Sequence, residues 1–289
     1  MTTYLVDGAD IGSIADAIRS KGGTTASLAF PSAFVSAIEA IPTGGEITSH
    51  VGDAAATTVA SSAYQSSWYI TEASFPMATT IGANAFRGCK ALSTVYYATN
   101  ANIGMDAFNG CTALLMMSLA MKSIGADAFS GCHALSTVRL STTASIGARA
   151  FAECTNLSQV IGMGSASTII GVNAFSGCRR LGSTFTISAN RISGTAFMSC
   201  WGLRSVTLYM GGTSPSVAGG AFSSCYNLSY LKISCSSVPG GVSTMFANTP
   251  LSVSTLTGAF GSIYVPSSLY TKFRSAVGWS QYSARMKSY

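Results

Sequence analysis

The chain has 289 residues and a net charge of +6, with 48% apolar and only 9% charged residues. A disordered chain would be poorer in apolar residues and richer in charge, so the composition excludes disorder as the main state. The longest apolar stretch, residues 113–121, is interrupted by Ser118 and is far shorter than the roughly 20 residues of a membrane-spanning helix, so no membrane insertion is expected.

The first 43 residues predict a small unit of two helices. Asp10 can cap a helix whose apolar residues follow helical spacing from Ile11 to Ile18, and a second helix begins after Pro31 and stops at Pro42. Two short helices cannot bury a core alone, so we expect them to dock on a partner or to assemble as an oligomer. Residues 44–58 are interpreted as a linker.

This N-terminal unit carries a resemblance. The string Leu5-Val-Asp-Gly-Ala-Asp-Ile-Gly-Ser-Ile-Ala-Asp-Ala-Ile-Arg-Ser-Lys-Gly-Gly23 resembles N-terminal segments of tail-associated proteins of phages and prophages of Gram-positive gut bacteria. The resemblance implies release by lysis, and the first residues lack the basic region and apolar core of a secretory signal. We expect a protein that is cytoplasmic until release and then extracellular or virion-associated, without a classical signal peptide.

An internal repeat with a step of 21–25 residues covers residues 59–262. Its unit, Ile-Gly-x-x-Ala-Phe-x-Gly-Cys-x-x-Leu, is clearest at Ile81–Leu92, and degenerate copies stand around Tyr64 and Phe246. Because an end coil has one neighbour instead of two, Phe246 is expected to be less enclosed than a central phenylalanine. The columns that recur through the seven full copies are Phe86, Phe108, Phe129, Phe151, Phe175, Phe197 and Phe222, then Cys89, Cys111, Cys132, Cys154, Cys178, Cys200 and Cys225, then Leu92, Leu114, Leu135, Leu157, Leu181, Leu203 and Leu228, with an Ile or Val five residues before each Phe.

Each repeat predicts one strand and one short helical turn. Residues after the Leu alternate, as in Val95-Tyr-Tyr97 and Val206-Thr-Leu208, which is typical of a strand with one buried face. The spacing of Ala-Phe-x-x-Cys is near one helical turn and predicts a short helix or 3₁₀ turn. This unit length falls in the leucine-rich-repeat range, so the sequence predicts a solenoid of about eight coils with a parallel β ladder and an interior of Phe, Leu, Ile and Cys.

The repeat unit resembles the BspA-like (Treponema-type) leucine-rich repeat of bacterial surface proteins, over roughly residues 59–266. The tail from Ile263 to Tyr282 resembles the last strand and amphipathic closing helix of that family, so residues 263–289 are expected to form a C-terminal strand and capping helix. The resemblance implies a right-handed solenoid used for adhesion and for binding proteins or glycans, with no catalytic residues. The signal sequence and surface anchor usual in the family are not found in this sequence.

The cysteine column predicts free, buried thiols. No Cys-x-x-Cys pair marks a metal site, and parallel side chains in successive coils do not give a disulfide dihedral. Cys235 lies outside the column and is expected in a loop, as the one candidate for a reactive thiol. The chain has two histidines, no acid after Glu153, and neither a nucleophile elbow nor a phosphate loop, so we expect no enzyme activity, cofactor or metal.

The outward face of the predicted strands is the candidate binding surface. Large side chains among small hydroxyls favour a recognition face, because Tyr and Arg are enriched at binding hot spots. The alternative is a plain solvated face rich in Ser and Thr. The candidate residues on this face are Tyr96, Met116, Arg139, Gln159, Ile161, Thr207, Tyr230 and Lys232.

Charge adds a second expectation. Residues 1–153 contain all ten acidic and seven basic side chains, whereas residues 154–289 contain nine basic side chains and no acidic one, and these include Arg179, Arg180, Arg191 and Arg204. This asymmetry favours an anionic partner, although dilute bases also serve solubility alone. No nucleic-acid motif accompanies them, so nucleic acid is not expected as a partner.

The sequence therefore predicts a non-enzymatic binding or adhesion module that recognises a protein or glycan on a cell surface, as a phage or prophage tail-associated protein. The alternatives are a bacterial surface adhesin exported by a non-classical route and a purely structural spacer.

Overall fold

The computed structural model describes residues 50–163, 168–212, 214–241, 244–252 and 261–289. The chain divides into two units, Met1–Thr48 and Ser49–Tyr289, and all described residues belong to the second. The two helices expected within residues 1–43 lie outside the described residues, as does the segment that resembles tail-associated proteins.

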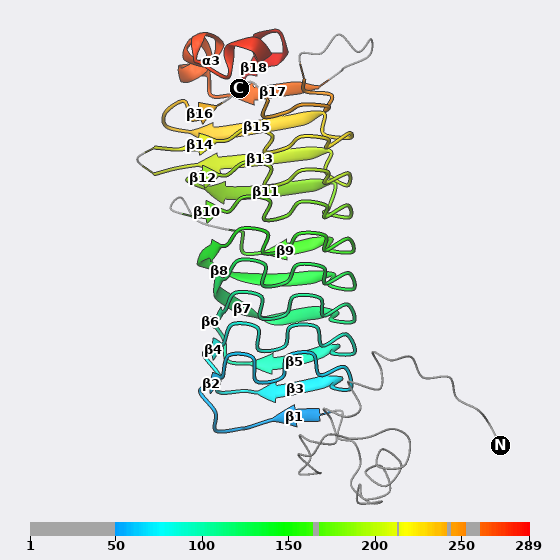
Figure 1. Ribbon diagram of the computed structural model, residues 1–289. Coiled ribbons are helices and arrows are strands. Elements are labelled where there is room, and N and C mark those ends of the chain that lie inside the picture. The colour runs from blue at the N-terminus through cyan, green and yellow to red at the C-terminus, as the bar shows by residue number, and fades with distance from the viewer. Residues whose placement is uncertain (1–49, 164–167, 213, 242–243, 253–260) are drawn as a thin grey trace, which may run out of the picture. The chain divides into compact units, whose positions relative to one another are not determined.

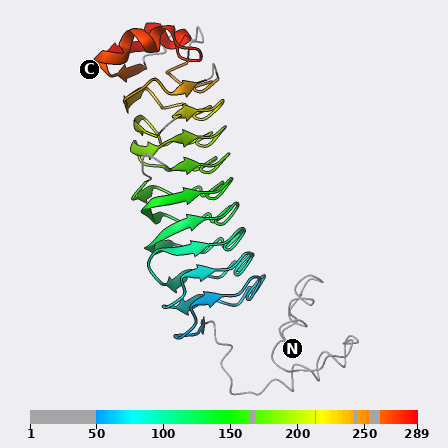
Figure 2. The same cartoon turned by 90° about the vertical axis from the view of Figure 1, so that its left-hand side faces the viewer.

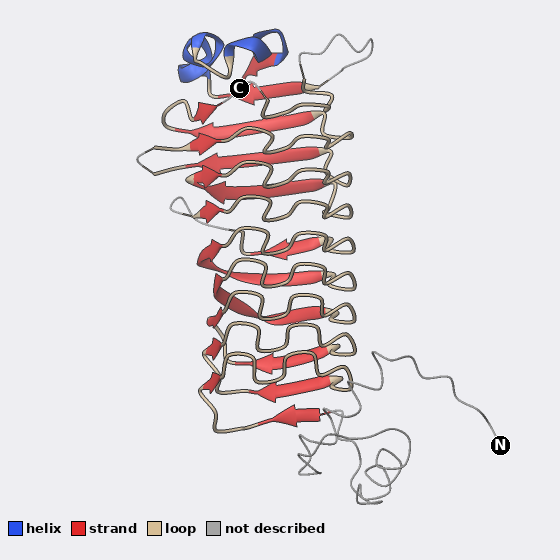
Figure 3. Ribbon diagram, in the orientation of Figure 1, coloured by secondary structure: helices blue, strands red, loops and turns tan. Residues whose placement is uncertain are grey.

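The second unit is a parallel β-solenoid of about ten turns (Figure 1). The strands, coloured red in Figure 3, run along two sides of the stack, and every described pairing between them is parallel. We call the first side the long-strand side. It contains β1 (His50–Gly52), β3 (Glu72–Phe75), β5 (Thr94–Tyr97), β9 (Gln159–Ile161), β11 (Thr184–Ala189), β13 (Ser205–Met210), β15 (Tyr230–Cys235) and β17 (Ser262–Val265).

The second side, which we call the short-strand side, carries strands of two or three residues. They are β2 (Thr58–Val59), β4 (Thr80–Ile81), β6 (Ala101–Ile103), β10 (Ile169–Ile170), β12 (Arg191–Ile192), β14 (Ser216–Val217) and β16 (Gly240–Gly241). β7 (Met116–Ile124) and β8 (Thr137–Ile146) are long enough to span both sides, since they pair at Met116↔Thr137 and again at Ile124↔Ile146. The repeated Ile of the sequence motif, or the Val that replaces it in β2 and β14, is buried in each of these short strands except β16, which is formed by two glycines.

The first described strand, β1, lies within the segment interpreted as a linker. His50, Val51 and Gly52 pair in parallel with Glu72, Ala73 and Ser74 of β3. The β ladder therefore begins before residue 59, because residues 50–52 contribute a strand to it.

The segment around each repeated phenylalanine is a series of turns with i→i+3 hydrogen bonds, such as Cys111 N–H to Phe108 O at 3.0 Å. Of the two expected forms, the short helix is wrong and the turn is confirmed. At Phe108, the flanking Asp106 and Gly110 both adopt left-handed backbone angles, with φ of 54° and 72°. These angles interrupt any helical run, and the N–H of Phe108 donates instead to the carbonyl of Ala128 in the next coil, at 2.8 Å. The turns thus form a third hydrogen-bonded ladder along the stack.

The glycine after the repeated Ile is needed for close approach between coils. A Cβ on Gly125 would lie 2.5 Å from the backbone N of Met105, in the preceding coil. Backbone cannot yield to such a contact as a flexible side chain can. The Ile-Gly pair of the motif therefore places a buried side chain and a backbone contact at adjacent positions.

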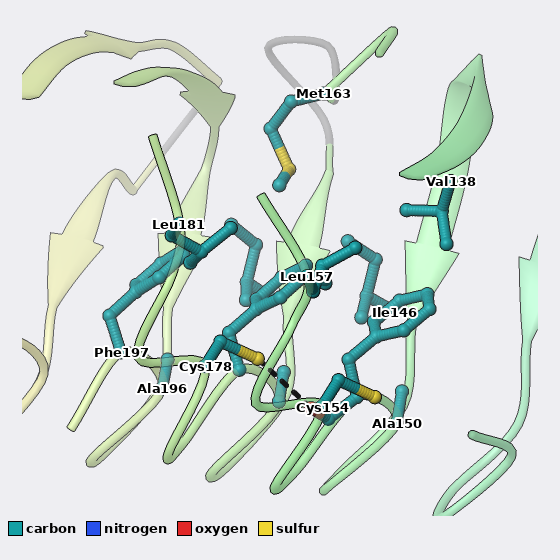
Figure 4. Close-up of a cluster of buried hydrophobic side chains, with 14 of the residues drawn as sticks. Val138, Ile146, Ala150, Cys154, Leu157, Met163, Cys178, Leu181, Ala196 and Phe197 are labelled. Carbon is teal, nitrogen blue, oxygen red and sulfur yellow. Dashed lines mark hydrogen bonds between the residues drawn. The ribbon is translucent and has the colours of Figure 1, made fainter. Parts of the chain in front are cut away.

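The rings of the repeated phenylalanines stack face to face along the interior. Phe151 is fully buried between Phe129 and Phe175, with ring centroids 5.2 and 5.1 Å away and interplanar angles of 2° and 12°. The spacing matches the roughly 4.8 Å between parallel strands, so the coil rise sets the distance between rings. Figure 4 shows how leucine, isoleucine and cysteine side chains from neighbouring coils fill the same interior.

The cysteine column also makes hydrogen bonds that the sequence did not reveal. Each thiol donates to the carbonyl of the repeated aromatic residue one coil earlier, as in Cys154 Sγ to Phe129 O and Cys178 Sγ to Phe151 O, both at 3.1 Å. Figure 4 shows these two thiols in successive coils. A thiol fits this site because it is small, apolar and a weak donor. All eight cysteines are free, as expected.

Cys235 is the last residue of β15 instead of a loop residue, and it is half-buried. Burial raises the pKa of its thiol to about 11. Because the thiolate is the reactive form, a raised pKa leaves little of it at neutral pH. The expectation of a loop thiol is therefore wrong, and burial also argues against high reactivity.

Thiol labelling provides a test of this interior. At pH 7 in the folded protein, we expect a disulfide reagent to label Cys235 slowly and the seven column thiols only after denaturation. Burial also raises the pKa of column thiols such as Cys132 and Cys154 above the ordinary value of 9. The free energy of unfolding should therefore fall as the pH rises above 9, because the unfolded chain then releases thiol protons that the folded chain retains. Below pH 9 this loss is absent. Cys235→Ser should abolish the native-state signal, and rapid labelling of three or more thiols would show that the column is not buried.

The C-terminal end of the stack is covered by a cap (Figure 2). After β17, the chain forms the 3₁₀ helix η1 (Ser267–Leu269), the helix α3 (Tyr270–Ser275), the 3₁₀ helix η2 (Ser280–Arg285) and the strand β18 (Met286–Ser288). The strand and helix expected within residues 263–289 are present. β18 was not anticipated, and it pairs in parallel with β17.

The cap corrects the expectation for Phe246. This residue is fully buried, because its ring stacks on Phe222 at 5.7 Å on one side and meets Tyr282 edge-on at 5.4 Å on the other. The ring of Trp279 is 6.3 Å from that of Phe246. The last phenylalanine of the column is therefore as enclosed as a central one.

Candidate functional site

The outward face of the long-strand side is assembled in columns by the strand register. In the C-terminal half, Thr186, Thr207, Lys232, Tyr264 and Lys287 are successive partners across β11, β13, β15, β17 and β18. On each strand the residue next to the outward one is buried, as are Val206 beside Thr207 and Leu231 beside Lys232. The alternation predicted from the sequence is therefore present, and it brings side chains from distant repeats into line.

The candidate residues on β5, β7, β8 and β9 do not lie in the same sheet as those on β13 and β15. Tyr96 is 47% exposed on β5, where it pairs with Ser74. Arg139 is exposed and faces the half-buried Ile161, while Gln159 is exposed beside Thr137. Met116 occupies the position on β7 that pairs with Thr137. Tyr96, Arg139 and Gln159 are therefore exposed at separate places along the stack.

The structure brings Tyr230 and Lys232 together with three residues that the sequence analysis did not select. Tyr230 and Tyr264 have ring centroids 4.9 Å apart, and the Nζ atom of Lys232 lies 4.2 Å from the ring centroid of Tyr289. The Nζ atom of Lys287 lies 5.7 Å from the ring of Tyr264. We call these five residues, Tyr230, Lys232, Tyr264, Lys287 and Tyr289, the tyrosine–lysine cluster.

The cluster is held in place while remaining accessible. The Tyr289 hydroxyl donates to the carbonyl of Ile233 at 3.1 Å, which ties the end of β18 to β15. Tyr289 is 46% exposed and Lys287 is exposed, whereas Tyr230, Lys232 and Tyr264 are half-buried. Side chains that are ordered before binding lose less conformational entropy on binding, so this arrangement suits recognition.

The electrostatic environment of the cluster is one-sided. No Asp or Glu follows Glu153 in the sequence, so no carboxylate side chain of the C-terminal half can neutralise its lysines. Acidic side chains in the other half are partly paired, as in the contact between Arg149 Nε and Asp127 Oδ1 at 2.7 Å. That hydrogen bond raises the pKa of the Arg149 guanidinium. The lysines of the cluster therefore have no acidic side chain of their own half of the chain to pair with.

The arginines of the basic half lie outside the cluster. Arg179 stacks on the exposed Trp201, with its Cζ atom 4.5 Å from the ring centroid, and Trp201 contacts Tyr226 in the next coil. Arg180 and Arg204 are exposed in the turns before β11 and β13, and Arg191 lies on β12 of the short-strand side. The bases therefore do not converge on one site.

Some of the residues that the sequence analysis did not select could have been found from the repeat pattern, and others could not. Tyr264 follows Ile263, which aligns with Leu231, so the repeat register could have placed it on the outward face. Lys287 and Tyr289 carried no such signal, because β18 does not follow the repeat motif. Trp201 stands directly after Cys200, a position that is exposed in most coils.

Two other kinds of functional feature, a metal site and a membrane-spanning helix, were sought in the described part of the chain. There, no cluster of three or more His, Cys, Asp or Glu side chains could hold a metal ion. No helix among the described residues is long and apolar enough to span a membrane.

A β-solenoid with one strand, one short strand and one turn per coil defines a leucine-rich-repeat scaffold. The model of the BspA type leucine rich repeat region matches residues 57–182 and 145–270. The chain therefore belongs to the BspA-type leucine-rich repeat family. Repeats of this family generally serve as protein-binding or adhesion modules and are typically non-catalytic.

Solved structures of bacterial leucine-rich repeat proteins resemble the chain at low identity. A leucine-rich repeat protein of Treponema pallidum is 22% identical, with 64% of this chain and 67% of that chain covered and a TM-score of 0.32. A leucine-rich cell surface protein of Faecalibacterium prausnitzii is 18% identical, with coverages of 85% and 88% and a TM-score of 0.35. A leucine-rich repeat protein of Bacteroides ovatus is 18% identical, with coverages of 81% and 87% and a TM-score of 0.26. No curated protein matches the chain significantly.

Proposed function

We propose that the chain is a non-enzymatic recognition module that binds an acidic protein surface through the long-strand side, with the tyrosine–lysine cluster at the centre of the contact. The observation that carries this proposal is the grouping of three tyrosines and two lysines, unopposed by any acidic side chain after Glu153. Tyrosines supply contact area at low entropic cost, and the lysines attract carboxylates.

We further propose that this module acts at the surface of a phage or prophage tail. Residues 1–43 are proposed to attach it to a phage or prophage tail, on the strength of their resemblance to tail-associated proteins. The protein would then act outside the cell that makes it. This attachment role is separate from the binding role of the solenoid, and each can stand without the other.

Binding to a defined acidic probe tests the proposed function. We expect the full chain to bind immobilised poly-L-glutamate, and acidic members of a panel of extracellular proteins, with an affinity that falls as salt is raised. Salt screens surface charges, with a Debye length of about 8 Å at physiological ionic strength. The double variant Lys232→Glu/Lys287→Glu should weaken binding about tenfold or more, because it places two negative charges against an acidic partner. Biolayer interferometry measures both effects.

Arg87→Glu is the matched control, since Arg87 is an exposed base in the acidic half of the chain. It should change the affinity less than twofold, on the order expected for a remote surface charge. Salt-independent binding, or an equal loss from the Arg87 change, would contradict the electrostatic part of the proposal. Failure to bind either the polymer or any panel protein would favour a structural spacer.

A further inference from the structure

A groove opens on the short-strand side, away from the tyrosine–lysine cluster. Its volume is about 580 Å³, within the range of small-molecule sites in proteins. In Figure 1 the strands that form it, β10, β12, β14 and β16, follow one another along the left edge of the stack. The residues that line the groove are Ile169, Asn190, Arg191, Ser214, Pro215, Ser216, Ser237, Val238 and Gly240.

The backbone of the groove is firmly anchored. The N–H of Ser216 donates to Asn190 O at 3.0 Å, and the N–H of Gly240 donates to Pro215 O at 2.8 Å. Behind Gly240, the indole N–H of Trp279 donates to Pro239 O at 2.7 Å. The backbone at Ser216 and Gly240 therefore belongs to the hydrogen-bonded stack, and Pro239 is tied to the cap.

The polar groups of the groove are those that recognise a carboxylate and hydroxyls together. Arg191 is exposed at the groove, and a guanidinium matches a carboxylate with paired hydrogen bonds. The serine side chains can both donate and accept. Asn190 Oδ1 is buried and has no hydrogen-bond partner among the described residues. Such an acceptor costs free energy, and turning the amide toward a ligand hydroxyl would recover it.

The apolar walls complete the match. Ile169 is 47% exposed and Val238 is half-buried, so both leave aliphatic surface at the groove. The C–H face of a sugar ring can pack on such surface while its hydroxyls reach the polar side. No acidic side chain follows Glu153, so none in this half of the chain repels a negative ligand.

We propose that this groove binds a carboxylate-bearing sugar. Arg191 holds the carboxylate, Asn190 and the serines hold ring hydroxyls, and Ile169 and Val238 contact the apolar face of the ring. The site is independent of the protein-binding surface proposed above, because it lies on a different side of the stack and uses different residues.

Glucuronic acid and its neutral counterpart glucose are the probes that test this site. In titrations of the full chain followed by saturation-transfer NMR, we expect glucuronate to bind and glucose to bind at least about tenfold more weakly, because only the acid can pair with the guanidinium. Arg191→Gln should remove most of that preference. Arg180→Gln, an exposed arginine of the same half outside the groove, should leave it unchanged.

A second variant fills the groove without touching its charge. A Cβ on Gly240 would lie 3.6 Å from Ser216 Cβ and 3.8 Å from Pro215 O, which are ordinary contacts. The site therefore has room for a Cβ, and Gly240→Val is expected to lose glucuronate binding, with an unchanged melting temperature as the check that the variant folds. Absence of glucuronate binding, equal affinity for glucose, or full binding in a folded Gly240→Val variant would each overturn the proposal.

Discussion

Replacing Phe151 by alanine is expected to lower the free energy of unfolding by about 3–5 kcal/mol. The side chain is fully buried, and both of its faces stack on neighbouring rings at 5.1–5.2 Å. Removing it leaves a cavity that the coils cannot close, because backbone hydrogen bonds hold them on either side. The shift of the midpoint in urea unfolding measures the loss.

Phe246→Ala should cost about as much as Phe151→Ala, since the cap encloses Phe246 as a neighbouring coil would. Leu115→Ala is the control for this pair of variants. Leu115 is 53% exposed in another coil, so its truncation should change stability by no more than about 0.5 kcal/mol. A clearly smaller loss at Phe246 than at Phe151 would contradict the packing of the cap against the last coil.

Trp279→Ala is expected to destabilise the protein by about 3–5 kcal/mol, because Trp279 is fully buried in the cap. Its ring meets Phe273 edge-on at 5.3 Å and its N–H satisfies the carbonyl of Pro239. The variant therefore loses apolar contacts and leaves a buried acceptor unpaired. Thermal unfolding should show the loss as a lowered melting temperature.

Val277→Ala, two residues away, is a stringent control for Trp279→Ala. Val277 is 89% exposed, so its change should leave the melting temperature nearly unaltered. If the two variants lost similar stability, the cap would not be packed on the stack as described. A Trp279→Ala variant of full stability would lead to the same conclusion.

The two proposed sites occupy different sides of one rigid stack. The tyrosine–lysine cluster lies on β15, β17 and β18, whereas the groove lies on β10, β12, β14 and β16. A surface that carries both acidic protein and acidic sugar could engage both sites at once, and the second contact would then be intramolecular. Binding to such a surface would be stronger than either contact alone, provided that both ligands can be reached together.

The repeat pattern predicted which side chains of the candidate site point outward, but not which of them meet. Tyr230 and Lys232 were expected on the outward face, and they alternate along β15 with the buried Leu231 and Ile233, because side chains of a strand point to opposite faces in turn. Placing Tyr96 and Tyr230 on one face did not predict which residues touch, since a face that spans many coils does not bring its residues into contact. Which outward residues form a cluster depended on Tyr264, Lys287 and Tyr289, and two of these follow no repeat.

Periodicity alone determined the solenoid, its parallel ladder and its buried columns of Phe, Cys, Leu and Ile, because each coil repeats the same contacts with its neighbours. It left open whether the segment around Phe108 is a short helix or a turn, and the left-handed backbone of Asp106 and Gly110 excludes the helix. The tertiary structure alone decided the enclosure of Phe246, the tyrosine–lysine cluster and the groove beside Arg191. Those features arise where a non-repeating segment or the loops of several coils meet in space, and such contacts leave no period in the sequence.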